Sequence, residues 1–302
     1  MKHDERFSGI HAVLFALFQD DETLDLTAMS NQADYCIEAG CHGVTILGLA
    51  TEVQKLTFDE KRKLVELTAQ AVGRRVPLSV TISGNSVAEQ IELIHCAEKN
   101  NADWLILQPP TVGNFSADVY LRFFERVSAA TELPVAIQNA PQYLGRSLSG
   151  ADLDALVSAC ANLKAVKSEE SALGIRQMTD ATDGRLCMLG GRGGLELTDS
   201  LRVGCQGFLL APDIVPVAVR LFNLWQNGRH DEAEALYMKI APAIIFTMRS
   251  LENFIAYGKR IYASHAKIKI HDRAPSLNTT AYGLQLAQGW ADHLANVLQQ
   301  SH

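Results

Sequence analysis

Short apolar runs alternate along this chain with longer stretches in which apolar side chains recur every three or four positions. Most of the short runs are continuous rather than alternating, which is typical of parallel strands that are buried on both faces. We therefore predict eight strands, over residues 11–17, 43–47, 76–82, 103–108, 134–138, 163–167, 185–189 and 207–211.

Helical patterns fill the intervals between these runs, and several of them open with a residue suited to helix capping. Thr57 is followed three positions later by Glu60, which is the spacing of a capping box, and Ser86 opens the next helical stretch. The predicted helices between strands cover residues 26–39, 57–72, 86–99, 116–131, 149–160, 173–180 and 194–203.

The pattern changes after residue 214, where helical stretches follow one another with no strand between them. They cover residues 217–226, 231–246, 251–264 and 280–299. Eight β/α repeats in about 210 residues, without a dinucleotide-binding fingerprint, favour closure into a (β/α)8 TIM barrel of the α/β class. We expect the barrel and its active site over residues 1–214 and a C-terminal helical extension over residues 215–302. No Gly/Ser/Pro-rich linker separates the two, so we expect them to pack together.

Composition narrows the class of protein. Of the 302 residues, 47% are hydrophobic, and no apolar run reaches the roughly 20 residues that span a membrane. The formal charge of −7 and the lack of a Lys/Arg-rich run argue against nucleic-acid binding. Asp4 and Glu5 stand where a signal peptide needs basic residues, and the six cysteines form no C-x-x-C pair. We interpret the chain as a cytoplasmic protein with free thiols.

Lys167 is the first candidate for chemistry, because catalytic residues of (β/α)8 barrels lie where the strands end. It ends the apolar run LKAVK, where a charged amine is costly to bury. One interpretation is structural: the amine reaches solvent or pairs with Glu169, Glu170 or Glu52. The other is catalytic: burial favours the neutral amine, which can attack a carbonyl carbon and form an imine.

Two further loops offer candidate binding groups. After the second strand, Gly48 and Thr51 can present N–H groups and a hydroxyl to a carboxylate, although Thr51 is equally suited to capping a helix. The GGRGG run at 190–194 suits a tight turn or an anion-binding nest but lacks the P-loop signature. The strand ends hold no His/Asp/Glu cluster suited to a metal, so we expect no metal and no cofactor.

In their order and spacing these segments resemble the dihydrodipicolinate synthase / N-acetylneuraminate lyase family. The resemblance rests on G-x-x-[TG]-E after strand 2, N-x-P after strand 5, the lysine ending strand 6 and a late G-C-Q-G-F-L-L, and it extends over nearly the whole chain. It implies a (β/α)8 barrel with a helical extension, a homotetramer built from dimers, and Lys167 as the residue that forms a Schiff base.

The sequence departs from the family pattern at several positions. The usual G-T-T-G-E or G-S-T-G-E reads Gly48-Leu49-Ala50-Thr51-Glu52, so both usual hydroxyls are missing and one stands a residue later. Gln138 replaces the tyrosine of Y-N-x-P, and Thr111-Val112 replace an aromatic residue. Gln142-Tyr143 stand where dihydrodipicolinate synthase has an arginine. These losses argue against lysine biosynthesis.

Gln138 also bears on the type of reaction. Retro-aldol cleavage needs a base for the C4 hydroxyl proton, which an amide cannot supply, whereas elimination from C4 needs only loss of a C3 proton. A family branch with this pattern contains 2-keto-3-deoxy-L-arabonate dehydratase and 1-pyrroline-4-hydroxy-2-carboxylate deaminase, which both yield 2,5-dioxopentanoate. The resemblance implies a small 2-oxo acid or cyclic imino acid as substrate, and a pyruvate-type aldolase is the alternative.

The predicted site has four parts with different roles. We predict catalysis by Lys167 and Gln138, a carboxylate clamp of Thr51, Ala50 and Leu49, a substrate channel lined by Gly191 and Arg192, and a C3 base that is Glu52, Ser168 or a water.

Two other classes of function are open at this stage. One is a barrel that binds small molecules without catalysis, and the survival of Lys167 argues against it, since a buried ammonium with no use carries a desolvation cost. The other is a metal-dependent hydrolase, and the lack of a ligand cluster at the strand ends argues against it.

Overall fold

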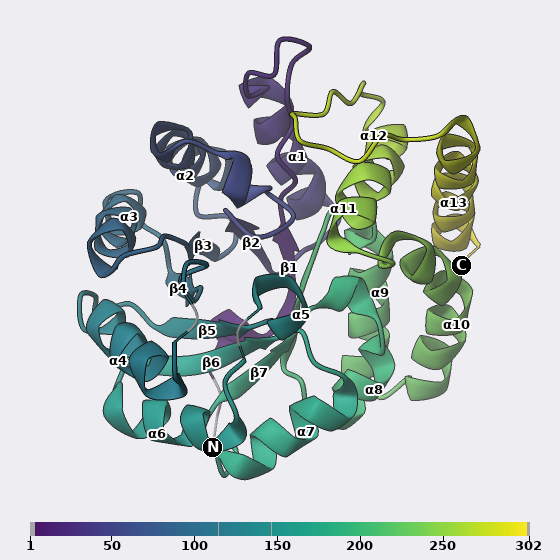
Figure 1. Cartoon of the computed structure of the whole chain (residues 1–302). Helices are drawn as coiled ribbons and strands as arrows, with labels where there is room; N and C mark the ends of the chain where they lie inside the picture. The colour runs from purple at the N-terminus through teal and green to yellow at the C-terminus, as the bar shows by residue number, and fades with distance from the viewer. Residues whose placement is uncertain (1–3, 114, 146, 301–302) are drawn as a thin grey trace.

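Eight parallel strands form a closed barrel in the computed structural model, which describes residues 4–113, 115–145 and 147–300 (Figure 1). Each strand pairs with the next along the chain, and the last pairs with the first. The strands are β1 (Gly9–Val13), β2 (Gly43–Ile46), β3 (Leu78–Ile82), β4 (Trp104–Leu107), β5 (Val135–Asn139), β6 (Leu163–Ser168), β7 (Cys187–Gly190) and β8 (Gly207–Leu210). The predicted (β/α)8 TIM barrel is confirmed, and every predicted strand overlaps an observed one.

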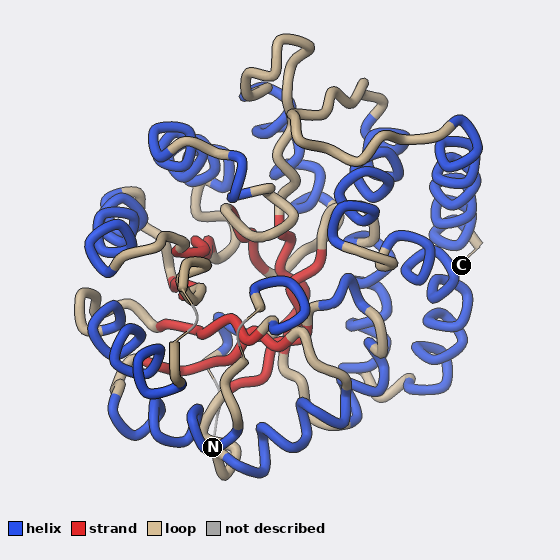
Figure 2. Tube along the Cα trace, viewed as in Figure 1, coloured by secondary structure: helices blue, strands red, loops and turns tan. Residues whose placement is uncertain are grey.

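Helices surround the barrel (Figure 2), and local sequence explains where several of them begin. The Thr57 side chain accepts the backbone N–H of Glu60, and the Glu60 side chain accepts the backbone N–H of Thr57, which is the predicted capping box. The Ser86 side chain likewise accepts the N–H of Glu89. The helices after the strands are α1 (Leu26–Glu38), α2 (Phe58–Val72), α3 (Val87–Lys99), α4 (Ala117–Ser128), α6 (Gly150–Ala159), α7 (Ala172–Ala181), α8 (Leu197–Arg202) and α9 (Val215–Gln226).

The strands are buried on both faces, as their continuous apolar runs predict. Lys164 on β6 is an exposed exception, and its amine donates to the carbonyl of Ala161 at 2.7 Å. Lys167 lies three positions further along the same strand, so its side chain points to the opposite side of the sheet, into the barrel. Strand alternation thus separates two lysines that are close in sequence.

The C-terminal helices pack on one side of the barrel, in green to yellow in Figure 1. They are α10 (His230–Thr247), α11 (Leu251–Asn253), the π-helical turn η4 (Phe254–Gly258), α12 (Lys259–Ala266) and α13 (Ala281–Gln299). The single helix predicted over 251–264 is therefore three segments. Because α9 packs both on β1 and on α10, the division at residue 214 stays a prediction. Residues 1–3 and 301–302 of the two predicted regions lie outside the described residues.

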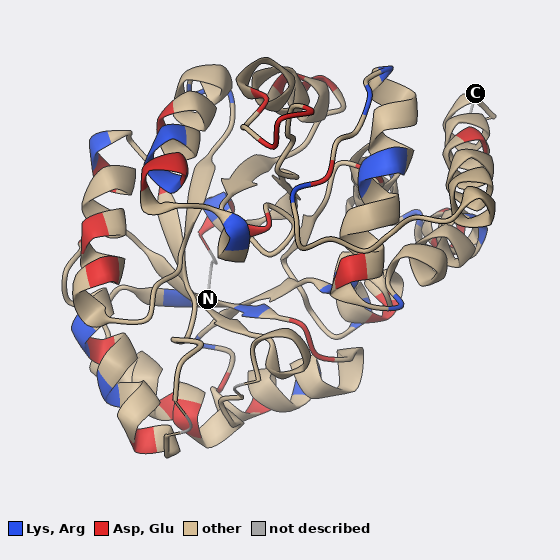
Figure 3. Cartoon of the chain, turned by 45° about the horizontal axis from the view of Figure 1, so that its top comes forward, with Lys and Arg blue, Asp and Glu red and all other residues tan. Residues whose placement is uncertain are grey.

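The distribution of charged residues and the state of the cysteines are typical of a globular protein. Acidic and basic side chains are intermixed over the outer helices (Figure 3). All six cysteines are free thiols, as predicted, and burial raises the pKa of Cys41 to about 11. Among the described helices, none has the length and apolarity that crossing a bilayer requires.

Asp213 lies in the loop after β8, where the barrel meets the C-terminal helices. Its side chain is buried, and its Oδ1 has no hydrogen-bond partner within the described chain. The neighbouring Gly258 belongs to η4, and a Cβ at that position would lie 3.4 Å from the Asp213 carboxylate. Burial away from water raises the pKa of Asp213 to about 7. The carboxyl group is therefore protonated in the folded protein below that pH.

We expect Asp213→Asn to stabilise the protein at alkaline pH. The folded-state pKa of about 7 lies above the unfolded value of 3.8, so the folded protein holds a proton that the unfolded chain releases over this window. Stability therefore falls as pH rises through it, by up to about 4 kcal/mol. Urea denaturation at pH 4 and pH 8 should show an advantage of the variant only at pH 8, and an equal advantage at both would contradict this assignment.

Candidate active site

The amine of Lys167 lies in the mouth of the barrel, at the carboxyl end of β6. The residue is 4% exposed and lines a cavity of about 50 Å³. This is the end of the barrel at which enzymes of the fold carry their active sites. The other lining residues are Val13, Leu49, Ala50, Tyr143, Glu169, Arg192, Gly193, Leu209, Ala211, Met248, Leu251 and Phe254.

Glu169 is the ion-pair partner of this amine. Its Oε1 lies 3.1 Å from the Lys167 Nζ, and its Oε2 accepts the backbone N–H of Arg192. Both side chains of the pair are buried, so the ion pair is shielded from water. The pairing that the structural interpretation predicts is present. The same geometry places a carboxylate where it can take a proton from the amine, so the two interpretations are compatible.

Gly191 makes room for Glu169. A Cβ at Gly191 would lie 2.5 Å from the carboxyl carbon of Glu169, closer than two non-bonded carbon atoms approach. The next residue, Arg192, has a left-handed φ of 51° that turns its N–H toward the carboxylate. Its side chain lines the cavity and pairs with Glu196 at 3.2 Å. Arg192 therefore borders the predicted channel, whereas Gly191 is important for the space it leaves.

The loop after β2 brings Leu49 and Ala50 to the cavity wall. Two overlapping turns shape it, in which Thr51 N–H donates to Gly48 and Glu52 N–H donates to Leu49, both at 3.0 Å. The N–H groups of Leu49 and Ala50 donate to no acceptor among the described residues. Successive free N–H groups form a concave anion site, so this part of the predicted carboxylate clamp is available.

The hydroxyl of Thr51, however, is directed elsewhere than predicted. Its Oγ1 donates to the backbone carbonyl of Leu14 at 2.7 Å, and the side chain is fully buried. A hydroxyl has one proton to donate, so this one is not available to a substrate carboxylate. Thr51 instead fastens the loop after β2 to the segment after β1.

Backbone strain marks the same loop. Leu47 and Glu52 adopt left-handed φ values of 64° and 53°, which side-chain-bearing residues rarely do. Gly48 has no room for a side chain, since a Cβ there would lie 2.5 Å from Cγ1 of Val13. Such strain persists where the surrounding structure holds it, and it is common at binding sites.

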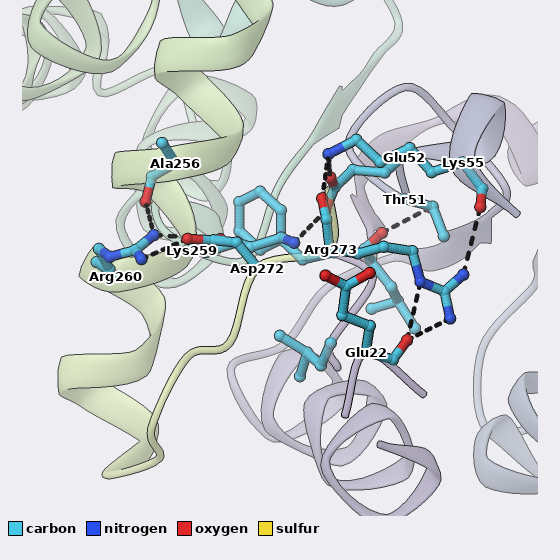
Figure 4. A network of polar contacts seen from close by, with 12 residues as sticks. Glu22, Thr51, Glu52, Lys55, Ala256, Lys259, Arg260, Asp272 and Arg273 are labelled. Carbon is cyan, nitrogen blue, oxygen red and sulfur yellow. Dashed lines mark hydrogen bonds and ion pairs between the residues drawn. The ribbon is translucent and has the colours of Figure 1, made fainter. Parts of the chain in front are cut away.

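Glu52 holds this loop through a buried group of charges (Figure 4). One carboxylate oxygen pairs with Lys259 on α12, and the other lies 2.5 Å from Lys55. Lys259 is fully buried, and burial lowers its pKa, an effect that the charge of Glu52 opposes. Glu52 is held by two ammonium groups and does not line the cavity that holds Lys167, so it is not placed to act as the C3 base.

The charge group continues into the segment after α12. The Lys55 amine donates to the carbonyl of Arg273 at 3.0 Å (Figure 4). The Arg273 guanidinium in turn binds Glu60 at 2.6 Å. Lys259 and Arg273 both lie over the ring of Phe18, at 5.1 and 4.3 Å from its centre. The C-terminal extension therefore fixes the loop that carries the predicted carboxylate clamp.

Gln138 and Ser168 lie on opposite sides of the sheet. Gln138 is the strand partner of Lys167, so it faces the barrel interior beside the amine. It accepts a hydrogen bond from the amide of Gln108 at 2.9 Å. Ser168 follows Lys167 directly and points away from the cavity, and its hydroxyl oxygen accepts the N–H of Glu170. Ser168 is therefore not placed to act as the C3 base.

Tyr143 lines the cavity together with Lys167 and Glu169 and was not predicted. It lies on α5 (Pro141–Leu144), a four-residue helix that is too short to show a periodic pattern. Burial, and secondly the charge of Glu169, raise the pKa of Tyr143 to about 12. The phenol is therefore a proton donor at neutral pH. The signal that could have revealed this helix is Pro141 at its first position.

Leu251 borders the mouth cavity and two larger ones. It lines a cavity of about 510 Å³ with Lys55 and Asp272, and another of about 420 Å³ with Gln142 and Arg249.

No group of three or more His, Cys, Asp or Glu side chains gathers as a metal site in the part of the chain that the structure describes.

Comparison with known proteins shows which family the sequence matches. The profile of the dihydrodipicolinate synthetase family matches residues 6–275. YagE of Escherichia coli K12, provisionally named a 2-dehydro-3-deoxy-D-gluconate aldolase, is 28% identical over 234 residues, which cover 76% of this chain and 77% of YagE. The 4-hydroxy-tetrahydrodipicolinate synthase of Methanosphaerula palustris is 26% identical over 241 residues, 78% of this chain and 82% of that protein.

Solved structures show the same fold. The 4-hydroxy-tetrahydrodipicolinate synthase of Methylacidiphilum fumariolicum SolV has a TM-score of 0.90 and 23% identity, with 97% of each chain covered. The crystal structure of YagE in complex with pyruvate has a TM-score of 0.89 and 23% identity, with 96% of this chain and 99% of YagE covered.

We expect Lys259→Met to destabilise the protein strongly. The substitution leaves the buried Glu52 with one partner, and breaking a buried ion pair on one side costs about 3–5 kcal/mol. Combining it with Glu52→Gln should recover much of the loss, because the remaining Lys55 ammonium is partly exposed and keeps its hydrogen bond to the carbonyl of Arg273. Urea denaturation measures both effects.

Arg260→Met is the matched control for this prediction. Arg260 follows Lys259 on α12, and its ion pair with Asp272 is partly exposed, so its loss should cost at most about 1 kcal/mol. Equal losses for the Lys259 and Arg260 variants would show that the buried charges do not hold the loop.

Proposed function

The chain belongs to the dihydrodipicolinate synthetase family, and on that premise we propose that it is a lyase that binds a small 2-oxo acid as a Schiff base on Lys167 and eliminates water. The observation that carries the proposal is the buried Lys167 amine, 3.1 Å from the Glu169 carboxylate in the mouth of the barrel. An ammonium must lose a proton before it can attack a carbonyl, and Glu169 is placed to accept that proton.

Lys167 and Glu169 together can carry out all the proton transfers of imine formation. The Lys167 ammonium gives a proton to Glu169, and the neutral Nζ forms a bond to C2 of the 2-oxo acid. Glu169 returns that proton to the C2 oxygen and then carries a second proton from the nitrogen to the same oxygen, which leaves as water, and the product is a protonated imine. The free N–H groups of Leu49 and Ala50 are the candidates for holding the C1 carboxylate during these steps.

Elimination uses the same carboxylate a second time. The protonated imine acidifies C3, and Glu169 removes a C3 proton to give an enamine. The electron pair of the enamine then expels hydroxide from C4, which takes up the proton from Glu169 and leaves as water. In a substrate with a C5 hydroxyl, the unsaturated imine then loses a proton from C5 and gains one at C3, the resulting enol becomes an aldehyde, and hydrolysis frees Lys167. With a 4,5-dihydroxy-2-oxopentanoate the net change is loss of one water, and the product is 2,5-dioxopentanoate. No step needs a base for the C4 hydroxyl, so glutamine at 138 is compatible with the reaction.

Deamination of a cyclic imino acid is the close variant of this chemistry. Lys167 would add to the C=N carbon of 4-hydroxy-1-pyrroline-2-carboxylate, and the ring would open by transimination. Loss of water from C4 would follow as above, and hydrolysis would release ammonia together with 2,5-dioxopentanoate. We propose that the chain belongs to the dehydratase and deaminase branch of the family and that it forms the homotetramer that the resemblance implies.

A pyruvate-type aldolase is the second candidate, because YagE carries that name and Tyr143 lines the cavity. Retro-aldol cleavage needs a group that takes the proton of the C4 hydroxyl. A pKa of about 12 keeps the Tyr143 phenol protonated and makes it a poor base at neutral pH. This favours elimination over cleavage.

Borohydride trapping tests the Schiff base. The protein with pyruvate and borohydride should gain a covalent adduct, visible in the intact mass and mapped to the peptide that carries Lys167. Lys167→Ala should show no adduct, whereas Lys164→Ala, on the exposed side of the same strand, should react as the natural protein does. An adduct that persists in Lys167→Ala would refute the assignment.

Glu169→Gln should slow both trapping and turnover, by about 100- to 10,000-fold for the loss of a general acid–base. Glu170→Gln is the matched control, because Glu170 is its sequence neighbour and does not line the cavity. The product identifies the reaction: 2,5-dioxopentanoate alone for dehydration, ammonia as well for deamination, and pyruvate for cleavage. Full activity in Glu169→Gln would exclude Glu169 as the acid–base group.

A further inference from the structure

A second set of buried polar side chains lies beside Lys167 and takes no part in the steps above. Gln108 and Gln138 are each 1% exposed and share a hydrogen bond of 2.9 Å. The remaining amide oxygen of Gln108 and the amide nitrogen of Gln138 have no partner among residues 4–113, 115–145 and 147–300. The hydroxyls of Thr81 and Ser83 are buried and unpartnered in the same way. Buried polar atoms without partners are costly, so their grouping in one place calls for a function.

Strand register places this set in the barrel interior, beside Lys167. Gln138 is the strand partner of Lys167, and Thr81 is the strand partner of Ile106. Gln108 follows Ile106 by two positions, and side chains two apart on a strand point to the same side. The hydrogen bond between the two amides then joins this group to the level of Lys167, at the carboxyl end of the barrel.

The side-chain amides of Gln108 and Gln138 together offer one donor and one acceptor, whichever way each amide is rotated. An amide has an N–H donor end and a C=O acceptor end, and one hydrogen bond between two amides uses one end of each. The pair therefore always leaves one N–H end and one C=O end unused, even if both side chains are rotated by 180°. A hydroxyl group, which donates and accepts at once, satisfies both ends.

Part of the chamber wall is apolar and is formed by Val13 on β1, Leu209 on β8 and Phe254 of η4, whereas Tyr143, Glu169 and Arg192 supply its polar groups beside Lys167. The backbone at Gln108 is also held in place, since the amide of Gln90 donates to the backbone carbonyls of Gln108 at 2.9 Å and of Gly84 at 3.1 Å. Polar and apolar groups around one amine impose an orientation on the arm of a bound 2-oxo acid.

We propose that Gln108 is a specificity-determining residue, which together with Gln138 binds a hydroxyl on the arm of the substrate beyond the imine carbon. The ligand class is a 2-oxo acid with a hydroxyl at C4, as opposed to a plain 2-oxo acid. Bound there, the C4 hydroxyl receives the amide N–H on its oxygen, which is the atom that departs in elimination. This inference rests on the proposed Schiff base at Lys167 and names the substrate class of that site.

The test compares two ligands that differ by one hydroxyl, 4-hydroxy-2-oxopentanoate and 2-oxopentanoate. Borohydride trapping at Lys167 over a concentration series gives the half-saturating concentration of each. The natural protein should prefer the hydroxylated ligand by at least roughly tenfold, because a site built around a hydroxyl rejects the analogue that lacks it. Gln108→Leu should reduce the preference to about twofold or less while 2-oxopentanoate is still trapped.

The ratio of the two half-saturating concentrations distinguishes a loss of hydroxyl recognition from a folding defect, because a folding defect weakens the binding of both ligands alike. Gln108→Met keeps the length of the side chain and serves if the leucine variant does not fold, and Gln70→Leu on the exposed face of α2 should leave the ratio unchanged. An unchanged ratio in the Gln108 variants, with trapping intact, would overturn this inference and leave the Schiff base standing. Absence of any adduct in the natural protein would overturn both.

Discussion

A buried amine beside a buried carboxylate is the contact on which the rest of this site depends. Two charges removed from water are stable only if each finds good partners, and Glu169 has the Lys167 amine on one oxygen and the N–H of Arg192 on the other. That requirement explains the left-handed turn after β7 and the lack of a side chain at Gly191. The ends of β6 and β7 therefore have the conformation that this ion pair requires.

The barrel could be predicted from sequence because its strands are continuous apolar runs, each bounded by turn residues and too short to form a helix of ordinary length. Contacts between segments that are far apart in the sequence could not be predicted in this way. The partner of Glu52 is Lys259, 207 positions away, and the acceptor for the Thr51 hydroxyl is the carbonyl of Leu14, 37 positions away. Local pattern therefore identified the loop after β2 correctly, but it did not reveal what Thr51 and Glu52 contact.

Elements shorter than a helical repeat were missed for a different reason. The four residues of α5 and the π-helical turn η4 give no periodic signal, yet they bring Tyr143 and Phe254 to the cavity. Glu169 was recognised as a partner of Lys167 but not as a base, because sequence gives neither its distance nor its burial. Gln108 carries no local signal either, and its importance follows from the strand register that sets it beside Gln138.

Leu251 has a consequence for the speed of the enzyme. The chamber of about 50 Å³ has room for a few water molecules, less than a five-carbon acid occupies. Leu251 also borders both larger cavities, together with Leu49 on one side and with Tyr143, Arg192 and Met248 on the other. A ligand that enters from either side meets these shared side chains, which must move to admit it. The rate of binding then depends on how readily this wall opens as well as on diffusional encounter.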